Sequence, residues 1–288
     1  MVMSDNICFP AKLVHEHIEA LVREGVDRIF MPFVVYEQGE GGQNSYNCPI
    51  VAGYSEVIKS VQAGTIPIDT PVVSFKDRKL LFRQCLAILT AWGVEERQVK
   101  KAFEEAERQQ ANYTADVAAC CEDILRRGQA EHRLTILLAG RPYHTDMLVQ
   151  HNISEIIAGM GANVITDDLV RGMDIAVDDV HFVAQWAYPN RILKAAKWCT
   201  QQAPDVQMVQ MTSFGCGPDA FLTDEVRDLL MRRSKTLTLL KLDDINNAGS
   251  LKLRVRSMIE SLKLANAHQQ EEKAQAKPFV TVPVYDER

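Results

Sequence analysis

The sequence predicts an α/β protein with parallel β-sheets that helices cover on both faces. Short apolar runs alternate with helical patterns along the chain, and a helix between two strands returns the chain so that the strands pair in parallel. The 288 residues suffice for two compact domains or one large one. The 47% hydrophobic and 24% charged residues are ordinary for a soluble globular protein.

The first part of the chain contains alternating helices and strands. Residues 4–24 are predicted to form a helix that Ser4 or Asp5 caps, with Pro10 near its start and Gly25 at its end. The predicted elements that follow are a strand over 26–35, a polar loop over 36–47, a helix over 48–62, a strand over 71–75 and a helix over 79–92.

A second α/β block follows a long charged segment. Residues 95–127 carry Ala and Leu at helical spacing, which predicts one helix or a helix pair that crosses between domains. Residues 269–277 are polar and Ala-rich, and we expect a solvated tail there. The elements predicted in between are strands over 134–139, 162–166, 206–212 and 237–242, and helices over 146–161, 189–202, 218–233 and 250–263.

Composition excludes several classes of protein. The net charge of -6 argues against a general nucleic-acid surface, and no apolar run approaches the roughly 20 residues that span a bilayer. The N-terminus lacks the basic region and apolar core of a secretory signal. Seven cysteines, an odd number, indicate a reducing cytoplasm rather than a disulfide scaffold.

Three cysteines lie at or near the starts of predicted helices, each beside Pro or Gly. They are Cys8 in NICFPAK, Cys48 in YNCPI and Cys216 in FGCGPD. A helix N-terminus favours a thiolate, because its free N–H groups stabilise negative charge. Together the three thiolates predict a shared iron–sulfur cluster with an open position, since three ligands leave one iron of a four-iron cluster free. Taken singly, each would be a buried structural thiol.

The other four cysteines fall within helical periodicity. We expect core or incidental surface positions for Cys85, Cys120, Cys121 and Cys199. The chain contains no CxxC, so the spacings of structural zinc sites and ferredoxins are missing.

Lys12 and His15 follow Cys8 by four and seven residues and share its helix face. Lys12 could offset the charge of a thiolate-ligated cluster, and His15 could transfer protons near neutral pH. The alternative for both residues is a solvated basic face.

The segment Gly140-Arg141-Pro142-Tyr143-His144 follows a predicted strand, as does Cys216. Because the carboxyl ends of parallel strands share one edge, both segments are expected at that edge. Arg141, Tyr143 and His144 could bind an anion such as a phosphate of a thioester cofactor, and the alternative is a plain turn. The sequence has no GxGxxG, P-loop or GxSxG motif, so we expect no ATP hydrolysis by this chain alone.

Five long motifs resemble one protein family. They are SDNICFPAKLVHEHI, YNCPIVAGYSEVI, AGRPYHTD, SFGCGPDAF and LKLDDINNAGSLKLRVRSMIESL. These motifs resemble the 2-hydroxyacyl-CoA dehydratase-like domain (2-hydroxyglutaryl-CoA dehydratase component D related). The resemblance is greatest to its version in large acyl-CoA dehydratase activase-related, or CoA activase, proteins, and it runs from Ser4 to about Leu264.

This resemblance implies two Rossmann-like lobes with a 4Fe-4S cluster between them, held by Cys8, Cys48 and Cys216. It implies a first lobe over 1–98, a connecting helical segment over 99–130, a second lobe over 131–264 and a tail over 265–288. It also implies a partner, an ATP-hydrolysing activase of the actin and sugar-kinase type, separate or fused, that delivers one low-potential electron. In true dehydratases of the family that electron makes a ketyl radical from a 2-hydroxyacyl-CoA, so that water is eliminated.

The activase modules of the family are absent from this sequence, which suggests a fragment, a split gene product or a stand-alone domain. Three functions remain open. The chain is the component that acts on a CoA thioester, or it is a non-catalytic electron relay or scaffold, or it is a zinc or structural-thiol protein.

Overall fold

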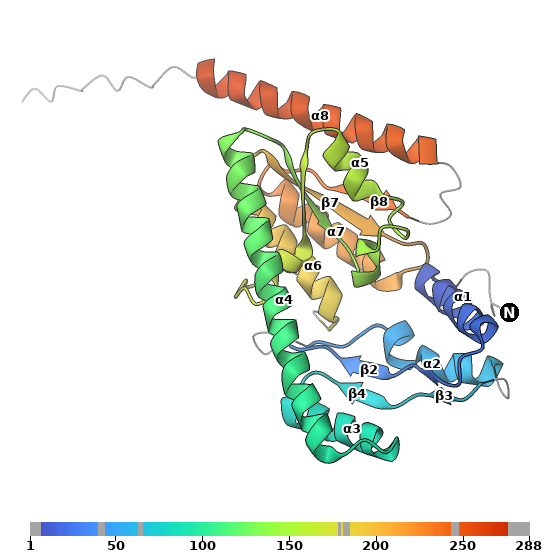
Figure 1. Cartoon of the computed structure of the whole chain (residues 1–288). Helices are drawn as coiled ribbons and strands as arrows, with labels where there is room; N and C mark the ends of the chain where they lie inside the picture. The colour runs from blue at the N-terminus through green and yellow to red at the C-terminus, as the bar shows by residue number, and fades with distance from the viewer. Residues whose placement is uncertain are drawn as a thin grey trace, which may run out of the picture.

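The computed structural model describes residues 7–39, 44–62, 66–177, 180, 185–242 and 248–275. In this part of the chain the named strands pair in parallel and helices cover their sheets, which confirms the predicted α/β class (Figure 1). None of the described helices combines the length and apolar character needed to cross a membrane.

Two short parallel pairs of strands lie in the lower half of Figure 1. Strand β1 pairs with β3, and β2 pairs with β4. The predicted strand over 26–35 is broken into β1 and β2 around Pro32, which has no N–H to donate to a neighbouring strand. The bounds in this part are α1 Phe9–Glu24, β1 Ile29–Phe30, β2 Phe33–Tyr36, α2 Pro49–Val61, β3 Ile68–Asp69, β4 Val72–Ser74 and α3 Arg78–Ala91.

The first helix begins later than predicted. Cys8 is its N-cap residue, whereas the expected caps Ser4 and Asp5 lie outside the described residues. Gly25 ends the helix as predicted, in the left-handed conformation at φ 69°, and its N–H bonds the carbonyl oxygens of Leu21 and Val22.

A single continuous helix, α4 (Glu96–Ala130), occupies the charged segment and confirms the helical prediction there. It contacts α3 at one end, and β6 (Asn163–Thr166) and η2 (Asp167–Val170) at the other. Figure 1 shows it running along one side of the molecule, past the small sheets and the larger one.

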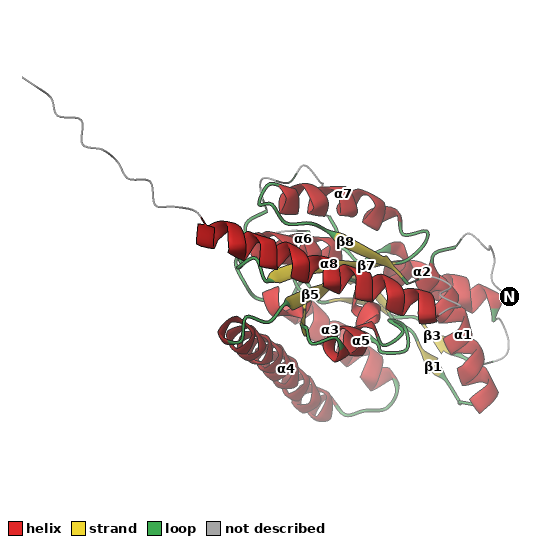
Figure 2. Ribbon diagram, turned by 90° about the horizontal axis from the view of Figure 1, so that it is seen from above, coloured by secondary structure: helices red, strands yellow, loops and turns green. Residues whose placement is uncertain are grey.

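The larger sheet has four parallel strands in the order β6-β5-β7-β8. Alternate residues of β5 face opposite sides: Leu137 and Ala139 pack with α4, α6 and α7, and Ile136 and Leu138 pack with α5 and α8. In the view of Figure 2, α8 lies across this sheet. The bounds are β5 Thr135–Ala139, η1 Pro142–Thr145, α5 Ile153–Gly159, β6 Asn163–Thr166, η2 Asp167–Val170, α6 Ala187–Thr200, β7 Val206–Thr212, α7 Gly217–Met231, β8 Thr238–Lys241 and α8 Ala248–Gln275.

Two elements in this part differ from simple expectation, and for one of them the predicted bounds were wrong. The helix expected over 146–161 is reduced to α5, because the chain turns before it and His151 and Asn152 adopt left-handed conformations. The segment expected as a solvated tail over 269–277 is helical as far as Gln275, since no helix breaker interrupts it before Pro278, and its solvation stays a prediction. Residues 276 and 277 lie outside the described part.

Candidate functional site

Three helices share the same kind of N-terminus. Cys8, Cys48 and Cys216 are the N-cap residues of α1, α2 and α7, each with an extended backbone and a Pro in the first two helical positions. None of the three side chains makes a capping hydrogen bond, and all three are half-buried free thiols. The prediction that these cysteines stand at helix starts is therefore confirmed.

This local structure follows from the sequence. Pro fixes φ near the helical value, and it lacks only an N–H that the first turn leaves unpaired in any case. The carbonyl oxygen of Cys48 accepts the N–H groups of Val51 and Ala52, both at 2.9 Å, so the helix is hydrogen-bonded from the cysteine onward. A cysteine at this position leaves its sulfur free for another partner.

Cys216 lies at the carboxyl end of the larger sheet, next to a buried ion pair. Arg141 follows β5, and its Nη2 donates to the sulfur of Cys216 at 3.7 Å. The same guanidinium forms an ion pair with Asp219, and its Nε donates to Oδ1 of that carboxylate at 3.1 Å. The hydroxyl of Thr212, at the end of β7, donates to the other carboxylate oxygen at 2.9 Å. The prediction that Arg141 and Cys216 share one edge of the sheet is thus confirmed.

Burial dominates the electrostatics of Cys216. Burial, followed by the Asp219 carboxylate, raises the pKa of the thiol to about 11, although the Arg141 guanidinium opposes the rise. The free thiol is therefore protonated at neutral pH, which corrects the expectation that the helix N-terminus alone yields a thiolate. A metal that binds this sulfur must displace its proton.

His144 and Tyr143 meet at Ser213. The backbone N–H of Arg141 donates to Nδ1 of His144 at 3.0 Å, so the ring proton lies on Nε2, which donates to the Ser213 hydroxyl at 3.0 Å. Tyr143 is hydrogen-bonded to the same serine. Burial, together with Arg141, lowers the pKa of His144 to about 4 although Asp219 opposes this, so the ring is neutral and cannot accept the proton of Ser213 through Nε2.

Gly140 allows this turn to form. A Cβ atom at Gly140 would lie 2.6 Å from Nδ1 of the fully buried His144. The N–H of Gly140 donates to Asp167 at 3.3 Å, and Asp167 in turn pairs with Nε of Arg191 at 2.7 Å. A second buried ion pair therefore supports the same edge of the sheet, beside that of Arg141.

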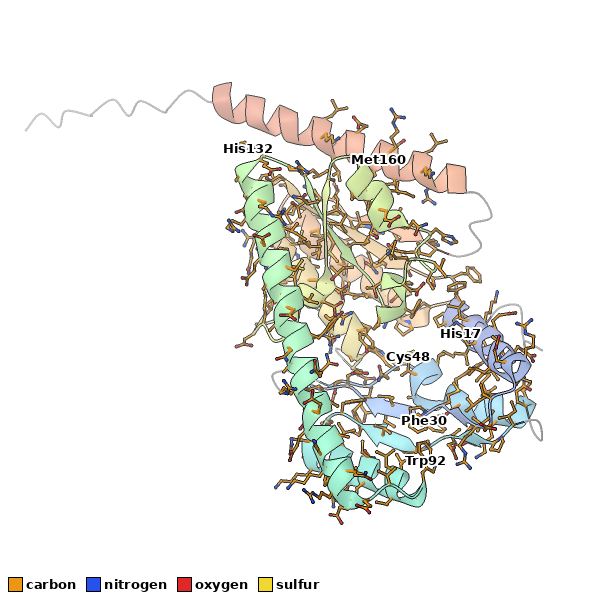
Figure 3. All side chains as sticks on the ribbon, in the orientation of Figure 1. His17, Phe30, Cys48, Trp92, His132 and Met160 are labelled. Atoms are coloured by element: carbon orange, nitrogen blue, oxygen red, sulfur yellow. The ribbon has the colours of Figure 1, made fainter. Side chains whose placement is uncertain are left out.

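Cys48 is positioned by the segment before it. Asn47 donates its backbone N–H to Val35 at 2.9 Å, which ties the segment to β2. Tyr46 accepts from Ala187 at 2.9 Å and donates to Gln185 at 3.0 Å, which ties it to the start of α6. Figure 3 shows Cys48 at the end of α2 that faces the elements of the larger sheet.

Lys12 and His15 lie on α1 as predicted, with different surroundings. His15 is buried, and its Nε2 lies 2.9 Å from the hydroxyl of Tyr54 on α2. Burial lowers the pKa of His15, because it disfavours the charged imidazolium. Burial also raises the pKa of Tyr54, and the charge of Cys8 adds to that rise. Lys12 is half-buried. The His15–Tyr54 contact thus holds together the two helices that begin at Cys8 and Cys48.

The structure therefore brings Arg141, Tyr143 and His144 to the surroundings of Cys216. Arg141 and His144 have internal partners there, and their role as phosphate ligands stays a prediction. Among the described residues, no three His, Cys, Asp or Glu side chains form a group that could hold a metal ion.

Sequence reasoning missed the groups that organise this edge. Asp219 and Ser213 are not among the site residues predicted from the sequence, although both lie inside the SFGCGPD motif. An acidic residue in the first turn of a helix, three positions after its cysteine cap, was the available signal for Asp219. No local signal identifies Ser213 as the partner of His144.

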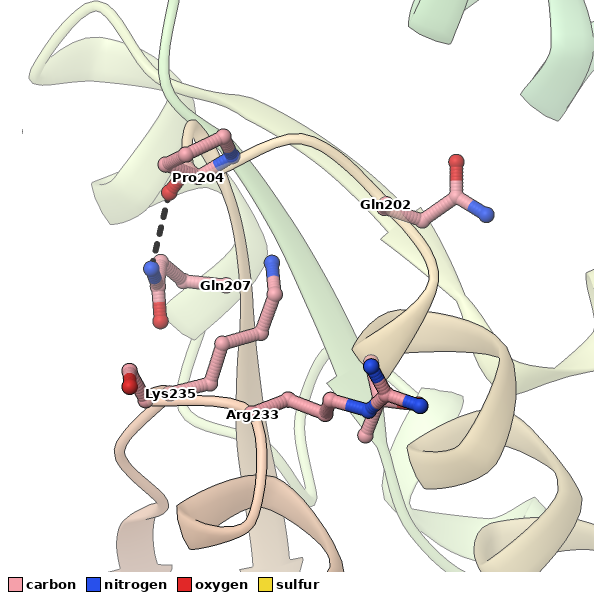
Figure 4. Close-up of a pocket in the computed structure, with 7 residues that line it drawn as sticks. Gln202, Pro204, Gln207, Arg233 and Lys235 are labelled. Atoms are coloured by element: carbon pink, nitrogen blue, oxygen red, sulfur yellow. Dashed lines mark hydrogen bonds between the residues drawn. The ribbon is translucent and has the colours of Figure 1, made fainter. Parts of the chain in front are cut away.

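A separate cavity of about 270 Å3 lies near the start of β7 (Figure 4). Its buried Lys235 donates to the carbonyl oxygens of Ala203 and Val206 at 2.8 and 2.5 Å, and Gln207 donates to Pro204 at 2.8 Å. These side chains stabilise the start of the strand, at the end of the sheet opposite to Cys216. The lining residues are Thr200, Gln202, Pro204, Gln207, Arg233, Ser234 and Lys235.

Gly140→Ala is expected to destabilise the protein by roughly 1–3 kcal/mol, because the added methyl group overlaps His144. Thermal unfolding measures the effect. Gly159→Ala is the matched control, since a Cβ there meets nothing within 4 Å and alanine favours the helix. Equal melting temperatures for Gly140→Ala and the unchanged protein would contradict the close approach.

His144 is expected to make stability depend on pH between 6.5 and about 4. In the unfolded state the imidazole of His144 binds a proton near pH 6.5, whereas in the folded state it binds one only near pH 4. The free energy of unfolding is therefore highest above this window and falls as the pH is lowered through it. The decrease in the free energy of unfolding approaches roughly 3 kcal/mol at the acid end of the window. Urea unfolding of the unchanged protein and His144→Gln at several pH values checks this. Parallel pH profiles for the two proteins would refute it.

Comparison with protein families identifies a match to part of the chain. Residues 1–170 match the family described as the CoA enzyme activase uncharacterised domain (DUF2229). This range contains Cys8, Cys48 and Arg141 and ends before Cys216. No curated protein matches the sequence. Because the match spans more than half of the 288 residues, the chain belongs to the CoA enzyme activase domain family.

Proposed function

We propose that this chain is the iron–sulfur component of an ATP-dependent, activase-driven electron system related to the 2-hydroxyacyl-CoA dehydratases. Membership of the CoA enzyme activase domain family supports a general role in such a system. The observation that carries the proposal is the shared N-cap position of Cys8, Cys48 and Cys216, none of whose sulfurs is used as a helix cap.

The three cysteines would hold a 4Fe-4S cluster between two Rossmann-like lobes, over 1–98 and 131–264. Their donor chemistry fits such a group, because all three are free thiols and soft ligands. The cysteines of a cluster bind different irons, so their sulfurs lie farther apart than the ligands of a single ion. When bound, a cluster with three protein ligands supplies one-electron transfer and one open coordination position.

The chain's own residues would set the charge and proton supply around this site. The first N–H groups of α1, α2 and α7 favour negative charge on the sulfurs. Arg141 adds a buried positive charge beside Cys216, and Lys12 adds another on the helix that Cys8 caps. His15 is hydrogen-bonded to Tyr54, and this pair would carry a proton beside Cys8.

The electron would come from a partner, an ATP-hydrolysing activase of the actin and sugar-kinase type, separate or fused. The substrate would be a CoA thioester or a similar hard-to-reduce compound, with Arg141, Tyr143 and His144 near its phosphates. A non-catalytic electron relay or scaffold is the second candidate. It is favoured by one observation, namely that Arg141 and His144 are already paired internally.

Replacement of each proposed ligand by alanine is expected to lower the iron and sulfide bound after anaerobic reconstitution, because each removes one of three cluster ligands. Cys85→Ala is the matched control, since Cys85 is also a half-buried free thiol but lies inside α3. Cys199→Ala tests a fully buried thiol in the same way. Full iron content in Cys8→Ala and Cys216→Ala would show that the assignment is wrong.

Binding at the open position separates the two candidates. If the chain acts on a thioester, acyl-CoAs or cyanide should perturb the EPR or Mössbauer signal of the one iron without a cysteine ligand. An unchanged spectrum with every compound, together with a fourth protein ligand, would favour the relay.

A further inference from the structure

We propose that Arg141 is a positioning residue that raises the reduction potential of the cluster by donating an N–H group to the sulfur of Cys216. The inference rests on the proposed function, because it concerns the group that Cys216 would bind. It assigns to Arg141 an action on the ligand sulfur, which the phosphate contact proposed above does not include.

The guanidinium is fixed against the helix that carries the sulfur. Arg141 contacts Cys216 at 3.7 Å through Nη2 and pairs with Asp219, three residues farther along α7. Thr212 donates to the second oxygen of Asp219 at 2.9 Å and so orients the carboxylate. Arg141 and Asp219 are 6% and 3% exposed, so water does not compete for these contacts. The contact with the sulfur is therefore a built feature of the fold.

Such a donor affects the two oxidation states differently. Reduction adds one electron to a thiolate-ligated cluster and makes its sulfurs more negative, with no bond broken. A hydrogen bond to a ligand sulfur stabilises that extra charge and raises the potential. The effect is large in a buried site, where solvent screens charges weakly.

The effect is confined to one of the three ligands. Within the described parts of the chain, no side-chain hydrogen bond is made to the sulfur of Cys8 or Cys48, whereas that of Cys216 accepts one from Arg141 and is also hydrogen-bonded to Asp219. A substitution of Arg141 therefore changes the surroundings of a single ligand and leaves the other two as they were.

Arg191 provides a matched control. It is 9% exposed, forms an ion pair with Asp167 and lies at the same edge of the sheet, but among the described residues it donates no hydrogen bond to a cysteine. Loss of either arginine breaks a buried ion pair and lowers stability. Only the loss of Arg141 removes a donor to a ligand sulfur.

The test is an EPR-monitored dithionite titration of the reconstituted full chain and of Arg141→Gln, Arg141→Lys and Arg191→Gln, with iron content measured on each sample. At the midpoint potential of the unchanged protein, the ratio of reduced to oxidised cluster in Arg141→Gln is expected to fall about tenfold, a shift of about 59 mV for one electron. Arg141→Lys should shift less in the same direction, since it keeps the charge and loses the fork of donors. Arg191→Gln should melt at a lower temperature and keep the original potential.

An Arg141→Gln protein with full iron content and an unchanged potential overturns the inference. If Arg141→Gln does not load iron, Arg141→Lys decides: a lowered potential supports the inference and an unchanged one overturns it. A shift in Arg191→Gln equal to that in Arg141→Gln also overturns it, because a general structural effect would then suffice. Absence of iron from the unchanged protein overturns the proposed function itself, and the iron assay identifies that case separately.

Discussion

The buried ion pair between Arg141 and Asp219 is the interaction on which the candidate site depends. It joins the turn after β5 to the first turn of α7, and the hydroxyl of Thr212 fixes its orientation from the end of β7. Removing two charges from water is costly, and only good geometry with further hydrogen bonds offsets that cost. Loss of one partner alone leaves an uncompensated buried charge, at about 3–5 kcal/mol. The sulfur of Cys216 lies beside this pair, so loss of the pair also changes the surroundings of the sulfur.

The second constraint is the repeated N-terminus of α1, α2 and α7. Three segments that are distant in the sequence adopt one local structure, an extended cysteine followed by a helix with Pro in its first turn. Pro is well suited to this position and cysteine is not among the residues that cap helices through hydrogen bonds. The sulfurs therefore contribute little to helix stability, which suits ligands better than structural caps. The residues that match the family model, 1–170, include α1 and α2 but not α7. Arg141 lies within that range and is joined to α7 by its ion pair with Asp219.

Much of the fold could be predicted, since strands such as β5 and β7 are short apolar runs bounded by turns, and α4 has a sustained helical pattern. The failures have local causes. Pro32 divides one apolar run into two strands, and left-handed residues at 151 and 152 replace two turns of an expected helix. The polar end of α8 looks like a tail by composition, although its residues favour a helix.

The candidate site was predictable only in part. Pro and Gly beside Cys8, Cys48 and Cys216 indicate helix starts, and this is a local signal. The partners of Arg141 and His144 are 78 and 69 residues away in sequence, so they depend on how two loops meet at the sheet edge. The raised pKa of Cys216 likewise arises from burial that no single motif encodes.

The most direct measurement is a crystal structure of anaerobically purified protein with anomalous scattering recorded at the iron edge. The account predicts one four-iron cluster bound by the sulfurs of Cys8, Cys48 and Cys216, with the fourth iron free of protein ligands. It also predicts that Arg141 lies beside Cys216 in the loaded protein, still paired with Asp219. Iron bound by other residues, zinc at these cysteines, or three well-ordered cysteines too far apart to share a cluster would contradict it.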